Sequence, residues 1–158
     1  IQERVGAIVQ AAEGLRGRLE TAVDQDTQAF GAVMSALRMP KETDAEKNSR
    51  ASALEQATLG AGEVPLAVAK DSSAVLDLAL EIATIGNISA LSDAGVAGDL
   101  AQAALHAAGL NVRVNAASLQ DPGPATRWLS ELASLQDSAQ EALTQLRSVL
   151  RERANLEA

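Results

Sequence analysis

The segment Ile85-Gly86-Asn87-Ile88-Ser89-Ala90-Leu91-Ser92-Asp93-Ala94-Gly95-Val96 separates two long, alanine-rich helical patterns. Gly86 and Asn87 predict a helix end, because both residue types tolerate the left-handed backbone conformation that often terminates a helix. Ser92 or Asp93 predicts the N-cap of the next helix, since its side-chain oxygen can accept hydrogen bonds from the first turn. We therefore expect a polar break enclosed between helices, a position at which helical bundles place ligand sites.

The composition is typical of close-packed helices. The 158 residues predict a single domain over 1–158 with enough chain to bury a core. Hydrophobic residues make up 47% of the chain, yet Phe30 and Trp128 are its only aromatic residues. Most of the apolar content is therefore small or aliphatic, which suits helices that approach one another closely.

Charge and residue usage exclude several classes of function. A net charge of −8 argues against a nucleic-acid partner, because binding to phosphates requires a basic surface. The chain has no cysteine and a single histidine, His106, so we expect no metal site and no disulfide. No apolar run approaches the roughly 20 residues that span a bilayer. These features predict a cytoplasmic protein without a membrane partner.

Apolar residues recur at helical spacing along most of the chain. The pattern predicts an all-α bundle of about five long antiparallel helices, at about 1–38, 44–64, 68–86, 93–119 and 125–155. We expect Pro65 to kink or break the pattern, because proline removes a backbone hydrogen bond. Thr43-Asp44-Ala45-Glu46 has the spacing of a capping box, and Asp121-Pro122-Gly123-Pro124 predicts a turn.

Polar residues interrupt these apolar faces at a few positions. Asp26 falls on the row of apolar residues that runs along the first predicted helix and continues to Phe30. We therefore expect its carboxylate on a buried face, where a charged group requires a hydrogen-bonding or charged partner. The alternative is an ion pair or a wet edge. Asn111 and Asn115 are one turn apart, although asparagine is unfavourable inside a helix, and this favours a polar partner over an exposed polar edge. Arg50 falls on the same side of its predicted helix as a row of apolar residues. Its side chain is therefore expected either to reach the surface or to bind an anion.

Several short segments together resemble the cyclodeaminase/cyclohydrolase family, which includes the C-terminal domain of formiminotransferase-cyclodeaminase and stand-alone methenyltetrahydrofolate cyclohydrolases. The similarity covers roughly residues 20–120. The segments are Asp26-Thr27-Gln28-Ala29-Phe30, Met39-Pro40-Lys41 with Arg50, Val64-Pro65-Leu66, Gly86-Asn87 with Ser92-Asp93-Ala94-Gly95-Val96, and Asn111-Val112 with Asn115. The family pattern also has a glycine-rich segment further upstream, which this sequence does not contain.

The resemblance implies an all-helical subunit that forms a homodimer or higher homo-oligomer through helix packing. It implies a tetrahydrofolate derivative as substrate, with or without a polyglutamate tail, and no cofactor beyond that substrate. The expected reaction is the cyclodeaminase ring closure of 5-formiminotetrahydrofolate to the 5,10-methenyl form with ammonia release. The alternatives are methenyltetrahydrofolate cyclohydrolase and an inactive helical oligomerisation or scaffold module.

The residues that match the family segments are also the polar residues that the helical pattern singles out. We expect Asp26 and Asp93 to be the catalytic carboxylates, because reaction through a tetrahedral carbon between two nitrogens requires groups that move protons. Lys41 and Arg50 are expected to bind the glutamate tail. The remaining expected substrate-binding residues are Phe30, Asn87, Ser92, Asn111 and Asn115.

Overall fold

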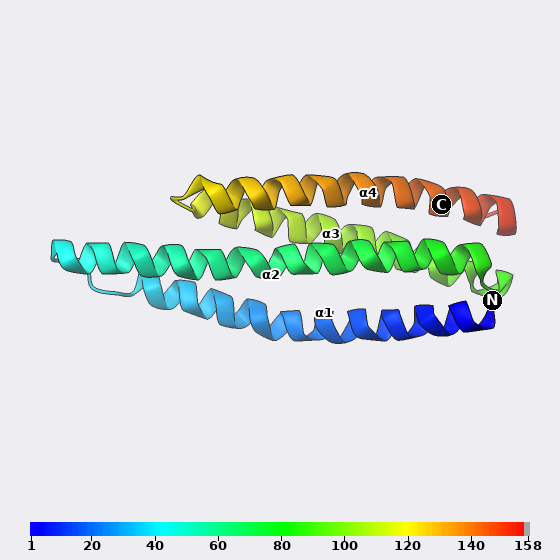
Figure 1. Cartoon of the computed structure of the whole chain (residues 1–158), viewed down its shortest axis with the longest axis horizontal. Helices are drawn as coiled ribbons and strands as arrows, with labels where there is room; N and C mark the ends of the chain where they lie inside the picture. The colour runs from blue at the N-terminus through cyan, green and yellow to red at the C-terminus, as the bar shows by residue number, and fades with distance from the viewer. Residues whose placement is uncertain (157–158) are drawn as a thin grey trace.

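The computed structural model describes residues 1–156 and consists of long helices that lie side by side (Figure 1). Within these residues there are four α-helices, one short 3-10 helix and no strand. The elements are α1 (Gln2–Leu37), α2 (Asp44–Ile85), η1 (Ile88–Ala90), α3 (Leu91–Ser118) and α4 (Pro122–Ala154). The predicted all-α class is confirmed.

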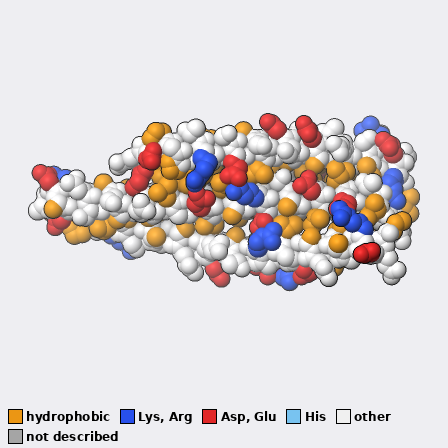
Figure 2. All heavy atoms as spheres, in the orientation of Figure 1, with side chains coloured by type: hydrophobic (Ala, Val, Ile, Leu, Met, Phe, Trp, Pro, Cys, Tyr) orange, Lys and Arg blue, Asp and Glu red, His pale blue; other side chains and the backbone are white. Residues whose placement is uncertain are grey.

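The longest helix, α2, is the centre of the fold. In Figure 1 it runs between α1 on one side and α3 with α4 on the other, and its first turns project past the other helices. Its N-terminus is the predicted capping box: Glu46 N–H donates to the Thr43 hydroxyl at 3.2 Å, and the Glu46 carboxylate accepts from Thr43 N–H at 2.8 Å. The projecting end makes the molecule taper in the space-filling view, where acidic and basic side chains are dispersed over the visible face (Figure 2).

Four helices form where about five were expected, because α2 continues through Pro65. Proline has no N–H, so it cannot bond the carbonyl of Ala61 four residues earlier. The side chain of Asn115 on α3 supplies the missing donor, with Nδ2 at 3.2 Å from the Ala61 oxygen. Because the neighbouring helix satisfies this carbonyl, the proline is tolerated inside the helix.

The segment around Gly86 ends α2 as predicted, but by a different local geometry. Gly86 is extended, with φ of −76°, and not left-handed. A Cβ at this position would lie 2.5 Å from the Ile82 oxygen, which explains the glycine. Asn87 caps η1, and α3 begins after Ala90 without a side-chain cap, so the predicted cap at Ser92 or Asp93 is wrong. Arg153 of α4 closes the end of α2 by donating to the Ala83 and Gly86 carbonyls.

The core lies between α2, α3 and α4. Trp128 is fully buried against α2, where a Cβ on Gly62 would come within 2.2 Å of the indole ring. Its Nε1 donates to the Glu63 carboxylate at 2.9 Å, so the one polar atom of the ring is satisfied. A similar close approach brings α3 to α4 at Gly98, whose Cβ would lie 2.3 Å from Leu146.

By contrast, α1 packs mainly on α2 and buries few side chains, namely Ile8, Leu15, Ala22 and Ala36. Much of its remaining apolar surface is exposed, including Phe30 at 65%. Among the described residues, no helix is long and apolar enough to cross a membrane.

Candidate functional site

A groove lies between α1 and α3 and has α2 as its floor. It consists of three adjoining hollows of about 410, 480 and 490 Å³. The first and second hollows share Leu19, and the second and third share Asp26 and Asn111. The groove is therefore continuous along α1. Its walls are mainly aliphatic, and its polar groups gather where the second and third hollows meet.

Asp26 and Asn111 stand at that meeting point, on α1 and α3 respectively. Asn111 Nδ2 donates to the Ala107 carbonyl at 3.3 Å, and its side-chain oxygen accepts no hydrogen bond from the described residues. The Asp26 carboxylate is exposed, not buried as expected, because no helix covers this face of α1. A ligand in the groove can thus reach both a carboxylate and an amide oxygen.

The third hollow also contains Phe30 and Asn115, so the structure brings together four of the predicted site residues. Both hydrogens of the Asn115 amide are engaged, one by the Ala61 carbonyl and one by the Asn111 carbonyl at 3.0 Å. Its direct role is therefore to hold α2 and α3 together beside Pro65. Substrate binding by Asn115 stays a prediction that involves only its side-chain oxygen.

Asp93, Ser92 and Asn87 lie at the opposite end of the bundle. Eighteen positions of α3 separate Asp93 from Asn111, a distance of about 27 Å at 1.5 Å per residue. All three residues are exposed, in contrast to the enclosed polar break that the sequence predicts. Asn87 is occupied in part by accepting from Ser89 N–H at 2.9 Å. Within one chain, the two expected catalytic carboxylates do not share a site.

The two predicted tail-binding cations lie beyond the third hollow. Lys41 is exposed in the connection between α1 and α2. Arg50 donates from Nε and Nη2 to the Leu37 carbonyl, at 3.3 and 3.2 Å, and so caps the end of α1. Leu37 and Leu54 line the far end of the third hollow. Leu54 follows Arg50 by one turn of α2. An extended ligand that begins at Asp26 would therefore point toward this arginine.

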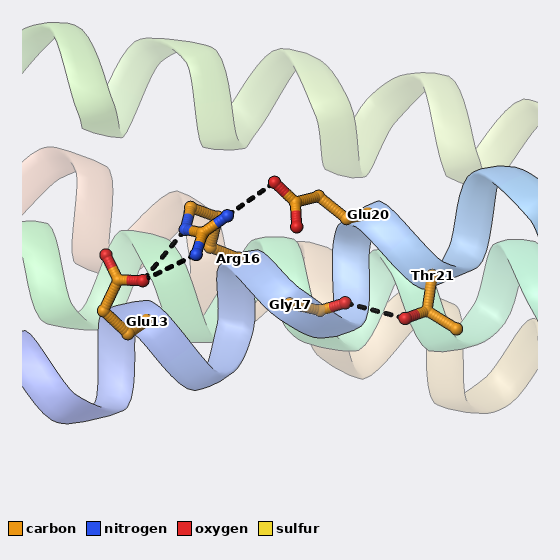
Figure 3. A network of polar contacts seen from close by, with 5 residues as sticks. All are labelled: Glu13, Arg16, Gly17, Glu20 and Thr21. Atoms are coloured by element: carbon orange, nitrogen blue, oxygen red, sulfur yellow. Dashed lines mark hydrogen bonds and ion pairs between the residues drawn. The ribbon is translucent and has the colours of Figure 1, made fainter.

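The first hollow is apolar except for Arg16 and Glu20 at its rim. Figure 3 shows that Arg16 is held between Glu13 and Glu20, at 2.9 and 2.5 Å. This pairing neutralises the cation locally, so an anionic ligand gains little from it. The hollow is better suited to an uncharged part of a ligand.

Sequence reasoning missed two hydroxyl groups of the groove. Thr27 lines the second hollow, and its hydroxyl donates to the Val23 carbonyl at 3.0 Å. Thr58 is buried in the wall of the third hollow. Its position four residues after Leu54 places it on the apolar stripe of α2, and that spacing could have identified it. No group of three or more acidic or histidine side chains suited to a metal occurs among residues 1–156.

Comparisons with known proteins identify the family of this chain. The family model described as formiminotransferase-cyclodeaminase matches residues 1–134. The chain belongs to this family. The matched residues include α1, α2 and α3, and with them every helix that lines the groove. The match to the family model therefore spans all the residues that line the groove.

Individual family members extend the comparison. The chain is 44% identical to a methenyltetrahydrofolate cyclohydrolase of Methylorubrum extorquens over 81% of its own length and 62% of that protein. It is 33% and 35% identical to the formimidoyltransferase-cyclodeaminases of Sus scrofa and Mus musculus, covering 84% of this chain and 24% of each relative. The chain thus spans less than two thirds of these family members.

A solved structure has the same fold. It is the crystal structure of the formiminotetrahydrofolate cyclodeaminase of Thermotoga maritima, which is 23% identical in sequence to this chain. The superposition covers 96% of this chain and 72% of the Thermotoga maritima chain, with a TM-score of 0.85. At that identity the likeness concerns the fold alone.

Proposed function

We propose that this chain forms the helical part of a methenyltetrahydrofolate cyclohydrolase, with the groove between α1 and α3 as its active site. The observation that carries the proposal is the convergence of Asp26 and Asn111 at the meeting point of two apolar hollows. Aliphatic walls suit the flat ring system of a folate, and one carboxylate suits its hydrolysis. Cyclohydrolase is preferred to cyclodeaminase because the 44% identical relative bears that name.

The proposed reaction uses Asp26 to move one proton. The carboxylate accepts a proton from water as the water oxygen bonds to the methenyl carbon between N5 and N10. The resulting tetrahedral carbon carries a hydroxyl group, for which the Asn111 side-chain oxygen is a hydrogen-bond acceptor. The carbon–N5 bond then breaks as Asp26 returns its proton to N5, and the hydroxyl proton passes to solvent. The product is the 10-formyl derivative, and no cofactor beyond the folate takes part.

Replacement of the carboxylate tests this role. The Asp26→Asn variant should lose about 10²–10⁴-fold in kcat, the usual contribution of a general acid–base group. The measurement is the disappearance of the methenyl absorbance after mixing with 5,10-methenyltetrahydrofolate. Asp24→Asn is the matched control, since Asp24 is exposed on the same helix and lines none of the hollows. Full turnover by a folded Asp26→Asn variant would remove Asp26 from the chemistry.

Cyclodeamination is the second candidate, favoured by the identity to the mammalian formimidoyltransferase-cyclodeaminases. In that reaction N10 attacks the formimino carbon on N5, and ammonia leaves after protonation. The substrate 5-formiminotetrahydrofolate separates the candidates, because ammonia release accompanies ring closure and not hydrolysis. A chain that releases no ammonia and leaves the methenyl ring intact supports the scaffold alternative.

A further inference from the structure

One buried hydroxyl in the groove has no hydrogen-bond partner among residues 1–156. Six threonines lie inside the α-helices. Five of them donate to the carbonyl oxygen four residues earlier, at 2.8 to 3.0 Å, namely Thr21, Thr27, Thr84, Thr126 and Thr144. The sixth, Thr58, is 4% exposed and forms no such bond within the described chain. Buried hydroxyls are normally paired, so this exception requires an explanation.

The Thr58 hydroxyl opens onto the third hollow. Thr58 belongs to the wall of this hollow, together with Asp26 and Phe30 of α1. In the part of the chain that the structure describes, the side-chain atoms that are both fully enclosed and unpartnered belong to Ser72 and Arg147, and the Thr58 oxygen is not one of them. A group that enters the hollow can therefore accept a hydrogen bond from Thr58.

The other hydrogen-bond donors in this part of the groove are already engaged. Beyond the meeting point of the second and third hollows, the remaining polar side chains of the third hollow are Asn115 and Ser118. Both amide hydrogens of Asn115 are bonded to backbone carbonyls, and the Ser118 hydroxyl donates to the Val114 carbonyl at 3.0 Å. Thr58 is thus the available donor in an otherwise largely aliphatic hollow, where a few polar groups fix the orientation of a ligand.

Charge favours one direction for an anionic ligand that lies along the groove. Toward the first hollow, Arg16 is already paired with Glu13 and Glu20, so a further carboxylate gains little there. Toward the other end, Arg50 pairs with no carboxylate of the described residues and donates to a backbone carbonyl alone. The third hollow also contains the ring of Phe30, against which an aromatic part of the ligand can pack.

The order of residues along α2 matches the order of groups in a folate. Val64 lines the second hollow and Ala61 the third, so the meeting point lies at this level of α2. Thr58 is about one turn further along, and Arg50 lies about 12 Å beyond Thr58 at 1.5 Å per residue. In a folate, N10 carries a benzene ring, an amide carbonyl follows on the opposite carbon of that ring, and the glutamate carboxylates come last. With its reacting carbon at Asp26, the ligand presents this carbonyl at the level of Thr58.

We propose that the Thr58 hydroxyl donates a hydrogen bond to the amide carbonyl between the benzene ring and the glutamate of the substrate. The inference rests on the proposed function, which places the reacting carbon at Asp26. Thr58 then selects for the benzoylglutamate arm of the folate and takes no part in the proton transfers.

Two substitutions separate this role from a structural one. Thr58→Val removes the hydroxyl and keeps the shape, so it should raise KM for 5,10-methenyltetrahydrofolate about 2- to 10-fold, the effect of one hydrogen bond, with kcat unchanged. Its Tm should equal or exceed that of the parent, because an unpaired hydroxyl is replaced by a methyl group. Thr58→Ser keeps the donor and should retain the parent KM with a lower Tm, since a buried methyl group is lost.

Thr84→Val is the matched control on the same helix. The Thr84 hydroxyl donates to the Leu80 carbonyl at 2.8 Å, and Thr84 lines none of the three hollows, so its KM should equal that of the parent. A Thr58→Val variant with the parent KM, or one with a reduced kcat at constant KM, would overturn the proposed contact.

A truncated substrate identifies the atom that Thr58 contacts. A 5,10-methenyl analogue whose N10 carries an unsubstituted phenyl ring has neither the carbonyl nor the glutamate. The parent should hydrolyse it with a higher KM, and Thr58→Val should then show the same KM as the parent, because the partner atom is missing. An equal rise in KM for the full and the truncated substrate would overturn the assignment to the carbonyl.

Calorimetric titration separates this contact from the proposed function. 5-Formyltetrahydrofolate carries the same benzoylglutamate arm and is not a substrate of the proposed hydrolysis. Thr58→Val should weaken its binding by the same 2- to 10-fold. A parent chain that binds this folate but turns over no substrate refutes the proposed function alone, and the titrations then decide the contact. A parent chain that does not bind it refutes both.

Discussion

The hydrogen bond from Asn115 to the Ala61 carbonyl should contribute to stability only because residue 65 is a proline. In the wild-type chain, Asn115→Ala leaves this carbonyl without a donor, and such a loss costs about 1–3 kcal/mol when the group is buried. Asn115 is half-buried and water can reach the site, so we expect about 1 kcal/mol, or a fall of roughly 2–4 °C in Tm for a chain of this size.

The Pro65→Ala background changes the expectation. Alanine restores an N–H that can donate to the Ala61 carbonyl within α2, so Asn115→Ala should then cost little. The double-mutant cycle should therefore show a coupling energy of about 1 kcal/mol between two residues on different helices. The single Pro65→Ala variant combines a gain in helix propensity with the loss of buried ring contacts, and the cycle cancels both.

Urea unfolding of the four chains, followed by circular dichroism, measures the cycle. Equal slopes of free energy against urea would show that the variants differ in stability and not in compactness. Asn111→Ala is the control, because its amide bonds a carbonyl of its own helix and should not couple to Pro65. A coupling below about 0.3 kcal/mol, the scatter of independent sites, would refute the idea that Asn115 lets α2 continue through the proline.

Two further predictions concern α2. Gly62→Ala should destabilise the fold by about 1–3 kcal/mol in thermal unfolding, because its Cβ would lie 2.2 Å from the Trp128 ring. Gly60→Ala, with no atom within 4 Å of its Cβ, should instead stabilise the helix by up to about 1 kcal/mol, and equal effects would contradict the packing argument. Hydrogen bonds from the Thr43 and Glu42 N–H groups lower the pKa of Glu46, so its ionised form stabilises the fold above the ordinary glutamate value of about 4.3. The Tm difference between wild type and Glu46→Gln should be widest near neutral pH and close as the pH falls through the lowered pKa; a difference independent of pH would argue against this cap.

The sequence predicts the helices well because their signals are local. The capping box at Thr43 and the end of α1 before Pro40 depend on residues within a turn of each other. The continuation through Pro65 could not be predicted in this way, since the compensating donor lies 50 positions away on α3. The position of Asn115 inside a helix predicts a polar partner, but the sequence does not show that this partner is a backbone carbonyl.

The candidate site was predicted in part for the same reason. Asp26, Phe30, Asn111 and Asn115 line one hollow, because their helical phase places them on faces of α1 and α3 that turn toward one another. The phase does not reveal how many neighbours a helix has. Since α1 packs mainly on α2, the apolar stripe of α1 is only partly covered, and Asp26 and Phe30 are exposed at its end.

The exposed apolar face and the divided pair of carboxylates have a common physical basis. A core between α2, α3 and α4 uses one face of α3, while α1, set against α2, leaves a second face of α3 uncovered. The large apolar side chains on that second face, such as Leu100 and Val114 at 66% exposed each, therefore gain only part of the burial that folding gives a core residue. The same arrangement leaves Asp93 exposed at the far end of α3 from Asn111, so within one chain no element brings it to the part of the groove that Asp26 lines.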